Sequence, residues 1–270
     1  MTFSSKRLAS RFLSQASIFA AAIVAFLPVT ANAALALPAP IISVILDAGP
    51  PEPDLRFFSA PGFHSLNGVG VTVALTPGPQ VVSDAFGRPD GGSNSSSAGL
   101  TYSYGLDGPA IDLLVPLFAT FRVFASASGG APGSEVLANA TLGIRGVNGT
   151  SFNRAEIAQS CAGCGPLEFK GTLSFLQLSG HFDKVELSVA TSTSAGAGVS
   201  ALARAFVDPY IFIDPAWLAD HPGYSVVVSA GIGNAAPGVA AIPEPQTYAM
   251  MLAGLGLLGF AAHRRRNKTA

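Results

Sequence analysis

The sequence predicts a mainly β protein: a single antiparallel β-sandwich, jelly-roll-like, of about eleven strands, with an apolar segment at each end of the chain. Three observations support this. Apolar and polar residues alternate along much of the 270-residue chain, and 30 Gly and 20 Pro residues gather largely between the alternating runs. Only 11% of the residues are charged, whereas ordinary globular domains carry about 25%. Many short strands separated by polar turns are typical of antiparallel sandwiches or barrels.

The alternation is clearest in residues 117–128. Leu117, Phe121 and Ala125 share one face of this run, and Thr120 and Arg122 share the other. A period of two marks a half-buried strand, and we expect phenylalanines at alternate strand positions to pack in the core. Runs of this kind predict strands at 41–46, 69–75, 80–84, 100–104, 117–128, 136–145, 167–176, 184–192, 199–207, 210–213 and 225–229.

Helix signals are scarce between the two ends. The clearest is 214–220, where Asp214 can cap the helix and Pro215 suits its first position. Pro222 and Gly223 would end it. We therefore assign residues 34–230 to the sandwich and residues 231–242, rich in Gly, Pro and Ala, to a tether.

The N-terminal end predicts a signal peptide over residues 1–33. Three basic residues, Lys6, Arg7 and Arg11, precede the apolar stretch 18–27. Ala31-Asn32-Ala33 is a small-x-small site, which places cleavage before Ala34. A register ending at Ala36 is left open. The apolar stretch is short for a membrane span, which takes about 20 residues.

The C-terminal end, residues 243–270, has three parts in order. Pro243-Glu244-Pro245 comes first, an uncharged run over 248–262 follows, and Arg264-Arg265-Arg266 comes after it. A helix of that length reaches about 22 Å, against a hydrocarbon core of about 30 Å. The run predicts a short transmembrane helix whose arginines stay on the cytoplasmic side.

This three-part order resembles the PEP-CTERM sorting signal of Gram-negative bacteria. The resemblance is carried by Pro243, Glu244 and Pro245, by the apolar run and by the arginines. It implies export, transient anchoring in the inner membrane and recognition by an exosortase, a cysteine-type membrane transpeptidase. It further implies a place at the cell surface or in an extracellular polysaccharide matrix. It says nothing of what the sandwich binds.

The net charge excludes nucleic acid as a partner. The span 34–242 holds eight of the 15 Lys and Arg residues and 15 of the 16 Asp and Glu residues, which gives about −7. A nucleic-acid-binding domain needs a basic patch or stripe. An acidic exterior instead keeps an exported domain soluble and repels phosphate polymers.

Cys161 and Cys164 are the only cysteines, and in an exported protein they predict a local disulfide. The closed loop is so short that its entropic contribution is only about 2 kcal/mol. Free thiols or a functional role are left open. A structural zinc site would need four ligands, and there is no second cysteine pair.

The sequence offers little support for catalysis. It has no Gly-x-Ser-x-Gly elbow. Asp107 with Asp112, and Asp208 with Asp214, are the nearest carboxylate pairs for glycoside cleavage, but Pro follows both members of the second pair, which is a turn and cap signature.

We therefore expect a non-catalytic surface or matrix protein without a cofactor. A calcium ion held by scattered loop oxygens is left open. The alternatives are a carbohydrate-binding module acting on extracellular polysaccharide and a secreted glycoside hydrolase.

Overall fold

The computed structural model describes residues 35–49, 54–87, 92–129, 134–147, 149, 151–160, 165–194 and 199–235. They contain thirteen strands and one short helix. In chain order these are β1 (Ile41–Ala48), β2 (Asp54–Phe58), β3 (Gly62–Leu66), β4 (Val69–Ala74), β5 (Gln80–Gly87), β6 (Ser93–Asp107), β7 (Leu114–Gly129), β8 (Glu135–Gly146), β9 (Ser151–Gln159), β10 (Leu167–Leu178), β11 (Phe182–Ser194), β12 (Ala201–Ile213), α2 (Pro215–Asp220) and β13 (Ser225–Val228).

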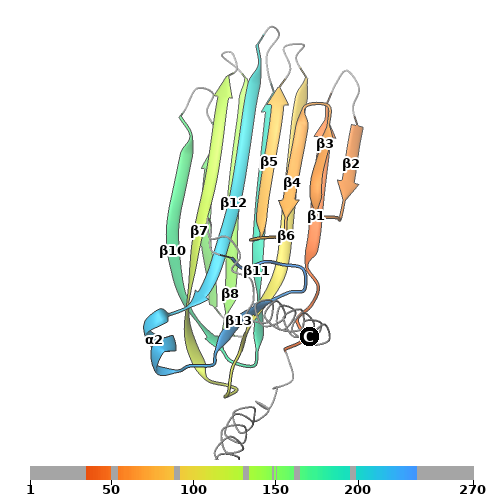
Figure 1. Cartoon of the computed structure of the whole chain (residues 1–270). Coiled ribbons are helices and arrows are strands. Elements are labelled where there is room, and N and C mark those ends of the chain that lie inside the picture. The colour runs from red at the N-terminus through yellow and green to blue at the C-terminus, as the bar shows by residue number, and fades with distance from the viewer. Residues whose placement is uncertain are drawn as a thin grey trace, which may run out of the picture. The chain divides into compact units, whose positions relative to one another are not determined.

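The strands form two antiparallel sheets that face each other (Figure 1). The seven-stranded sheet has the order β2-β1-β6-β11-β8-β9, with β13 pairing with the lower part of β6. The six-stranded sheet has the order β10-β7-β12-β5-β4-β3. The predicted antiparallel sandwich is confirmed at this level, and its jelly-roll-like strand order stays a prediction.

The core lies between the sheets and consists mainly of Val, Leu, Ile and Ala side chains. β1 alternates strictly between exposed and buried positions, as a strand with one solvent face must. The predicted inner face of residues 117–128 is also confirmed, since Leu117, Phe121 and Ala125 are all buried.

The expectation that strand phenylalanines fill the core is wrong for most of them. Among the described residues, only Phe121 and Phe175 are phenylalanines of the buried core. Four others, Phe118, Phe124, Phe206 and Phe212, lie on the outward-facing positions of β7 and β12. The physical reason is that the outward positions of both strands mix aromatic residues with polar and charged ones, while small residues such as alanine fill much of the inner face. A period of two separates the two faces of a strand, but it does not place every phenylalanine on the inner one.

Each predicted strand is present, and two of them merge. Residues 199–207 and 210–213 belong to the single strand β12, which runs through Pro209. Proline interrupts a ladder because it has no backbone N–H. Here β5 pairs with β12 only as far as Val207. The Ile211 N–H, on the same edge as the Pro209 nitrogen, donates to the Asn234 side chain. Pro209 therefore lies at a position where no neighbouring strand needs a backbone N–H donor.

Three strands were not predicted: β2, β3 and β9. All three are edge or near-edge elements, and β2 and β3 are only five residues long. β2 lies at the edge of one sheet and β3 at the edge of the other, on the same side of the sandwich (Figure 1). Strands of this kind bury too few side chains to show the alternation that identifies a central strand.

The predicted helix is present as α2, which lies at one end of the sandwich (Figure 1). The Asp214 side chain accepts a hydrogen bond from the Ala216 N–H at 2.9 Å, and Pro215 takes the first helical position. α2 is far too short to cross a bilayer, and no membrane-spanning helix is found within the described ranges.

Candidate functional site

The outer face of the six-stranded sheet carries a row of side chains that crosses four strands. Strand register places Phe206 of β12 opposite Phe124 of β7 on one side and Val82 of β5 on the other, and Thr72 of β4 lies opposite Val82. Neighbouring strands are about 4.8 Å apart, so the row extends over about 14 Å. Phe124 and Phe206 are half-buried, so part of each ring remains open to solvent.

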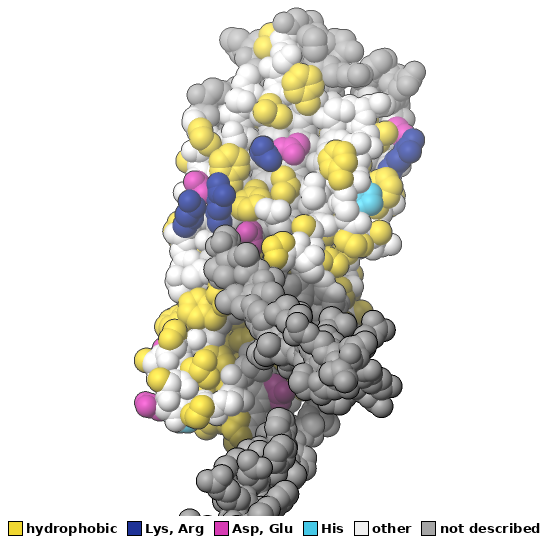
Figure 2. Space-filling view, in the orientation of Figure 1, with side chains coloured by type: hydrophobic (Ala, Val, Ile, Leu, Met, Phe, Trp, Pro, Cys, Tyr) yellow, Lys and Arg dark blue, Asp and Glu magenta, His cyan; other side chains and the backbone are white. Residues whose placement is uncertain are grey.

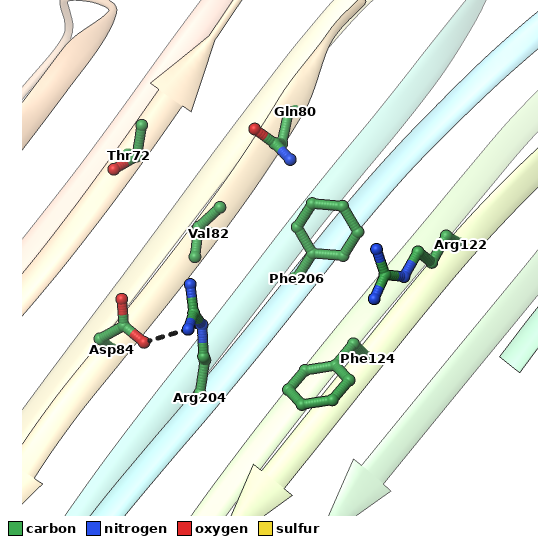
Figure 3. A pocket seen from close by; sticks show the side chains of 8 residues that line it. All are labelled: Thr72, Gln80, Val82, Asp84, Arg122, Phe124, Arg204 and Phe206. Carbon is green, nitrogen blue, oxygen red and sulfur yellow. Dashed lines mark ion pairs between the residues drawn. The ribbon is translucent and has the colours of Figure 1, made fainter. Parts of the chain in front are cut away.

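Charged residues flank this row on both sides, because side chains two positions apart share a face. On one side, Arg204 lies opposite Asp84, and its Nε is 3.3 Å from an Asp84 carboxylate oxygen. On the other side, the Arg122 guanidinium lies over the Phe206 ring, 5.3 Å from its centroid. Figure 3 shows Arg204 turned toward Asp84 and Arg122 beside Phe206.

Glu168 of β10 is the shared carboxylate partner of two cations at the β7 side of the face. It forms ion pairs with Arg122 and with Lys170, whose Nζ is 3.1 Å from the Glu168 carboxylate. Asp208 lies directly opposite Arg122 in the strand register. Arg122 is therefore paired with Glu168 and lies across from Asp208, while its guanidinium lies over the Phe206 ring.

These side chains surround a shallow hollow of about 490 Å³. In the space-filling view this face shows hydrophobic side chains with basic and acidic groups set among them (Figure 2). The volume of the hollow falls within the 300–1,000 Å³ range of small-molecule sites, but the hollow is open to solvent where those sites enclose most of their ligand. Its lining consists of Thr72, Gln80, Val82, Asp84, Arg122, Phe124, Arg204 and Phe206.

The carboxylates of this face respond differently to their surroundings. Burial raises the pKa of Asp84, and the nearby Arg204 opposes that rise. Burial likewise raises the pKa of Asp208 against the influence of Arg122. The Lys170 hydrogen bond and the charge of Arg122 lower the pKa of Glu168. Desolvation favours the neutral acid, and a neighbouring cation favours the anion.

The arrangement is suited to binding, because it combines aromatic surface with fixed donors and acceptors. A guanidinium offers only N–H donors and a carboxylate offers only acceptors when ionised. Asp84 is the single carboxylate among the eight lining residues, whereas glycoside cleavage uses a carboxylate pair.

The aspartates singled out from the sequence lie in separate settings. Asp112 is 2.6 Å from His181 through its Oδ1, and Asp214 caps α2. Asp107 ends β6 opposite Ser225, and Asp208 lies on the outer face of β12. Of the four, only Asp208 adjoins the hollow. No sequence signal joined Asp208 to Phe206 and Arg122, because their alignment depends on strand register.

The other predicted sites lie outside the described residues. These are the cleavage site at Ala31, Ala33 and Ala34, the cysteines Cys161 and Cys164, the motif residues Pro243, Glu244 and Pro245, and the basic end Arg264, Arg265 and Arg266. The described residues hold no group of three or more His, Cys, Asp or Glu side chains that could bind a metal. Calcium binding stays a prediction.

The described part of the chain is thus a β-sandwich with a hollow of about 490 Å³ on the outer face of the six-stranded sheet and another of about 420 Å³ beside Arg145 and Glu186 on the seven-stranded sheet. A family model, the PEP-CTERM protein-sorting motif, matches residues 241–266. The match includes Pro243-Glu244-Pro245 and the three arginines. The chain therefore carries a PEP-CTERM sorting motif at its C-terminus, which implies export, sorting by an exosortase and a location in the cell envelope or at its surface.

No curated protein matches the sequence. Among solved structures, the carbohydrate-binding module TmCBM61 in complex with β-1,4-galactotriose overlaps with a TM-score of 0.25 at 12% identity, over 54% of this chain and 83% of that one. The infectious bursal disease virus Gx strain structure overlaps with a TM-score of 0.17 at 11% identity, over 84% of this chain and 69% of that one. Overlaps this weak support no inference about fold or ligand.

Proposed function

We propose that this chain is an exported protein processed by an exosortase, and that its sandwich has a non-catalytic role at the cell surface or in the extracellular matrix. The observation that supports it most is the motif match at residues 241–266. The proposal includes removal of residues 1–33 ahead of Ala34. It also includes a Cys161–Cys164 disulfide formed after export, because compartments outside the cytoplasm favour oxidised thiols.

The order of the tail gives each part a physical role. A short apolar run anchors weakly, and the arginines after it resist being pulled through the bilayer. The Pro-Glu-Pro tripeptide then lies just outside the membrane, on the side of the sandwich. Prolines keep this segment out of a helix, so it stays extended and accessible to a processing enzyme.

The sequence supplies its own control for a test of processing. Pro-Glu-Pro occurs twice, at 243–245 and at 51–53. In the full chain tagged within the sandwich, alanines at 243–245 should leave export intact but block removal of the tail. Alanines at 51–53 should leave processing unchanged. Fractionation and intact mass of the tagged protein measure both.

Replacing Arg264, Arg265 and Arg266 with glutamine tests the other half of the signal. These variants should weaken retention and correct orientation in the inner membrane. If the 243–245 variant loses its tail and reaches the surface like wild type, exosortase processing is wrong and a simple membrane anchor replaces it.

A second candidate function is the binding of matrix polysaccharide by the sandwich. The hollow on the six-stranded sheet supports it, because sugar rings stack on aromatic side chains while their hydroxyls hydrogen-bond to charged groups. Phe124 and Phe206 supply the aromatic surface, and Asp84 and Arg204 supply an acceptor and a donor side by side.

A further inference from the structure

The charges around the hollow balance. Among the described residues on this outer face, three are cations and three are acids. Each cation has a carboxylate partner: Arg204 pairs with Asp84, and both Arg122 and Lys170 pair with Glu168. The third acid, Asp208, lies opposite Arg122. The face therefore offers many charged groups but no net charge.

This balance disfavours a charged ligand. A polyanion binds where unpaired cations release its counterions, and here it would have to displace Asp84 or Glu168 from an arginine and then lie beside the displaced carboxylate. A polycation meets the same difficulty with the arginines. These are exposed ion pairs, so separating one costs little, but a charged ligand finds no surplus of opposite charge on this face in return.

A neutral sugar meets no such cost. Each of its hydroxyls can donate one hydrogen bond and accept others, so neighbouring hydroxyls can bridge Asp84 and Arg204 without separating them. The C–H face of a sugar ring can meanwhile pack on Phe206 or Phe124, as apolar surfaces do on aromatic rings. The row from Thr72 to Phe124 crosses four strands, which suits a short oligosaccharide better than a single ring.

We infer that the hollow across β4, β5, β12 and β7 binds a stretch of charge-neutral polysaccharide, with Phe206 and Phe124 as the stacking surface and the Asp84–Arg204 pair as the hydroxyl-binding group. The inference rests on the second candidate function proposed above, and it is independent of sorting by the tail. Arg122, held by Glu168, borders the Phe206 ring on the β7 side.

The other outer face provides a matched control. There Arg145 lies over Phe152, 5.4 Å from the ring centroid, and pairs with Glu186 at 3.2 Å. This trio repeats the chemistry of Arg122, Phe206 and Glu168, but Phe152 does not line the hollow. Phe152→Ala therefore removes a comparable exposed ring from a place that the inference does not use.

The test is affinity electrophoresis of the full chain, purified in detergent, in gels containing one soluble polysaccharide each. Dextran, galactan and glucomannan are the neutral probes, and alginate is the acidic one. We expect saturable retardation by at least one neutral probe and none by alginate. Phe206→Ala and Asp84→Asn should each weaken that retardation about tenfold, equivalent to about 1.4 kcal/mol, while Phe152→Ala leaves it unchanged. Circular dichroism should show all three variants folded.

Three results would overturn the inference, and the first two would leave polysaccharide binding by the sandwich standing. Binding of alginate without any neutral probe would reject the neutral ligand but keep polysaccharide binding. Neutral binding that is lost in Phe152→Ala and kept in both Phe206→Ala and Asp84→Asn would move the site to the other face. Retardation by none of the four probes would reject the site and the second candidate function together, and sorting by the tail would be unaffected.

Discussion

The two outer faces of the sandwich use the same local trio in different surroundings. On the seven-stranded sheet, Phe152 lies over Gly143, where an added Cβ would come within 2.8 Å of the ring. That ring covers a residue without a side chain, as aromatic residues do for exposed strand glycines. On the six-stranded sheet, Phe206 lies instead between Val82 and Phe124. Both faces have a hollow, and the difference lies in the ring. Phe152 covers a glycine and does not line the hollow of about 420 Å³ beside Arg145 and Glu186, whereas Phe206 lines the hollow on the six-stranded sheet together with Phe124.

The two outer faces also differ in how far other segments of the chain cover them. The outward side of the central strands in the seven-stranded sheet includes Gly99 and Gly105. A Cβ on Gly105 would come within 2.8 Å of the His181 carbonyl oxygen. Near this end of the sheet, Ser229 of the segment after β13 also donates a hydrogen bond to the Pro38 carbonyl. The lower part of this face is therefore closed by the chain itself.

The largest difference in stability between the faces should appear when a side chain is added to the covered face of the seven-stranded sheet. We expect Gly105→Val to destabilise the protein by about 1–3 kcal/mol, the usual range for overpacking, because the His181 carbonyl belongs to the backbone and cannot move aside. Urea unfolding followed by circular dichroism measures the loss.

Thr120→Val on the outer face of β7 is the control for that substitution. Thr120 is half-buried on the open face, and valine suits a strand at least as well as threonine. The control should change stability by no more than about 0.5 kcal/mol. Equal losses at the two positions would show that the faces do not differ in coverage.

Alanine substitutions of Arg122 and Arg145 should differ less in the stability that they remove. We expect Arg122→Ala to cost about 1 kcal/mol, because it removes the stack on Phe206, an exposed ion pair with Glu168 and the cation beside half-buried Asp208. Arg145→Ala removes a stack and an exposed pair with Glu186, so it should cost less than about 1 kcal/mol. Thermal unfolding of both variants at one pH and salt concentration makes the comparison. A greater loss for Arg145→Ala would contradict it.

The sequence predicted the sandwich better than the candidate site, and the reason is physical. Alternation along 117–128 and 136–145 reports local burial, so it located the long central strands. It could not show that Phe124 and Phe206 are neighbours, because they lie 82 positions apart and meet only through the pairing of β7 with β12. One hint was present: Phe118 and Phe124 share their parity with Arg122, which the sequence placed on the polar face.

The smallest expected change in stability follows the replacement of Asp208, and its size depends on pH. Burial raises the Asp208 pKa in the folded protein above the ordinary 3.8, despite the opposing influence of Arg122. Well below 3.8 the carboxyl is protonated in both states and affects stability little. As pH rises from there through the folded pKa, the unfolded chain loses its proton first, so the folded state becomes relatively less stable. Asp208→Asn should therefore raise stability at pH 7 by no more than about 0.5 kcal/mol, and this gain should vanish near pH 3.

Glu168→Gln on the same face is the control with the opposite sign. Lys170 and Arg122 lower the Glu168 pKa below its ordinary 4.5, so its ionised form stabilises the fold above that pH, and the contribution disappears as pH falls through the folded pKa. Glu168→Gln should therefore lower stability at pH 7 and have little effect at low pH. Melting temperatures of both variants and wild type at pH 3, 5 and 7 distinguish the two signs. A loss of stability at pH 7 in both variants would contradict this expectation. It would mean that the attraction of Arg122 for the ionised Asp208 carboxylate exceeds the cost of burying that charge.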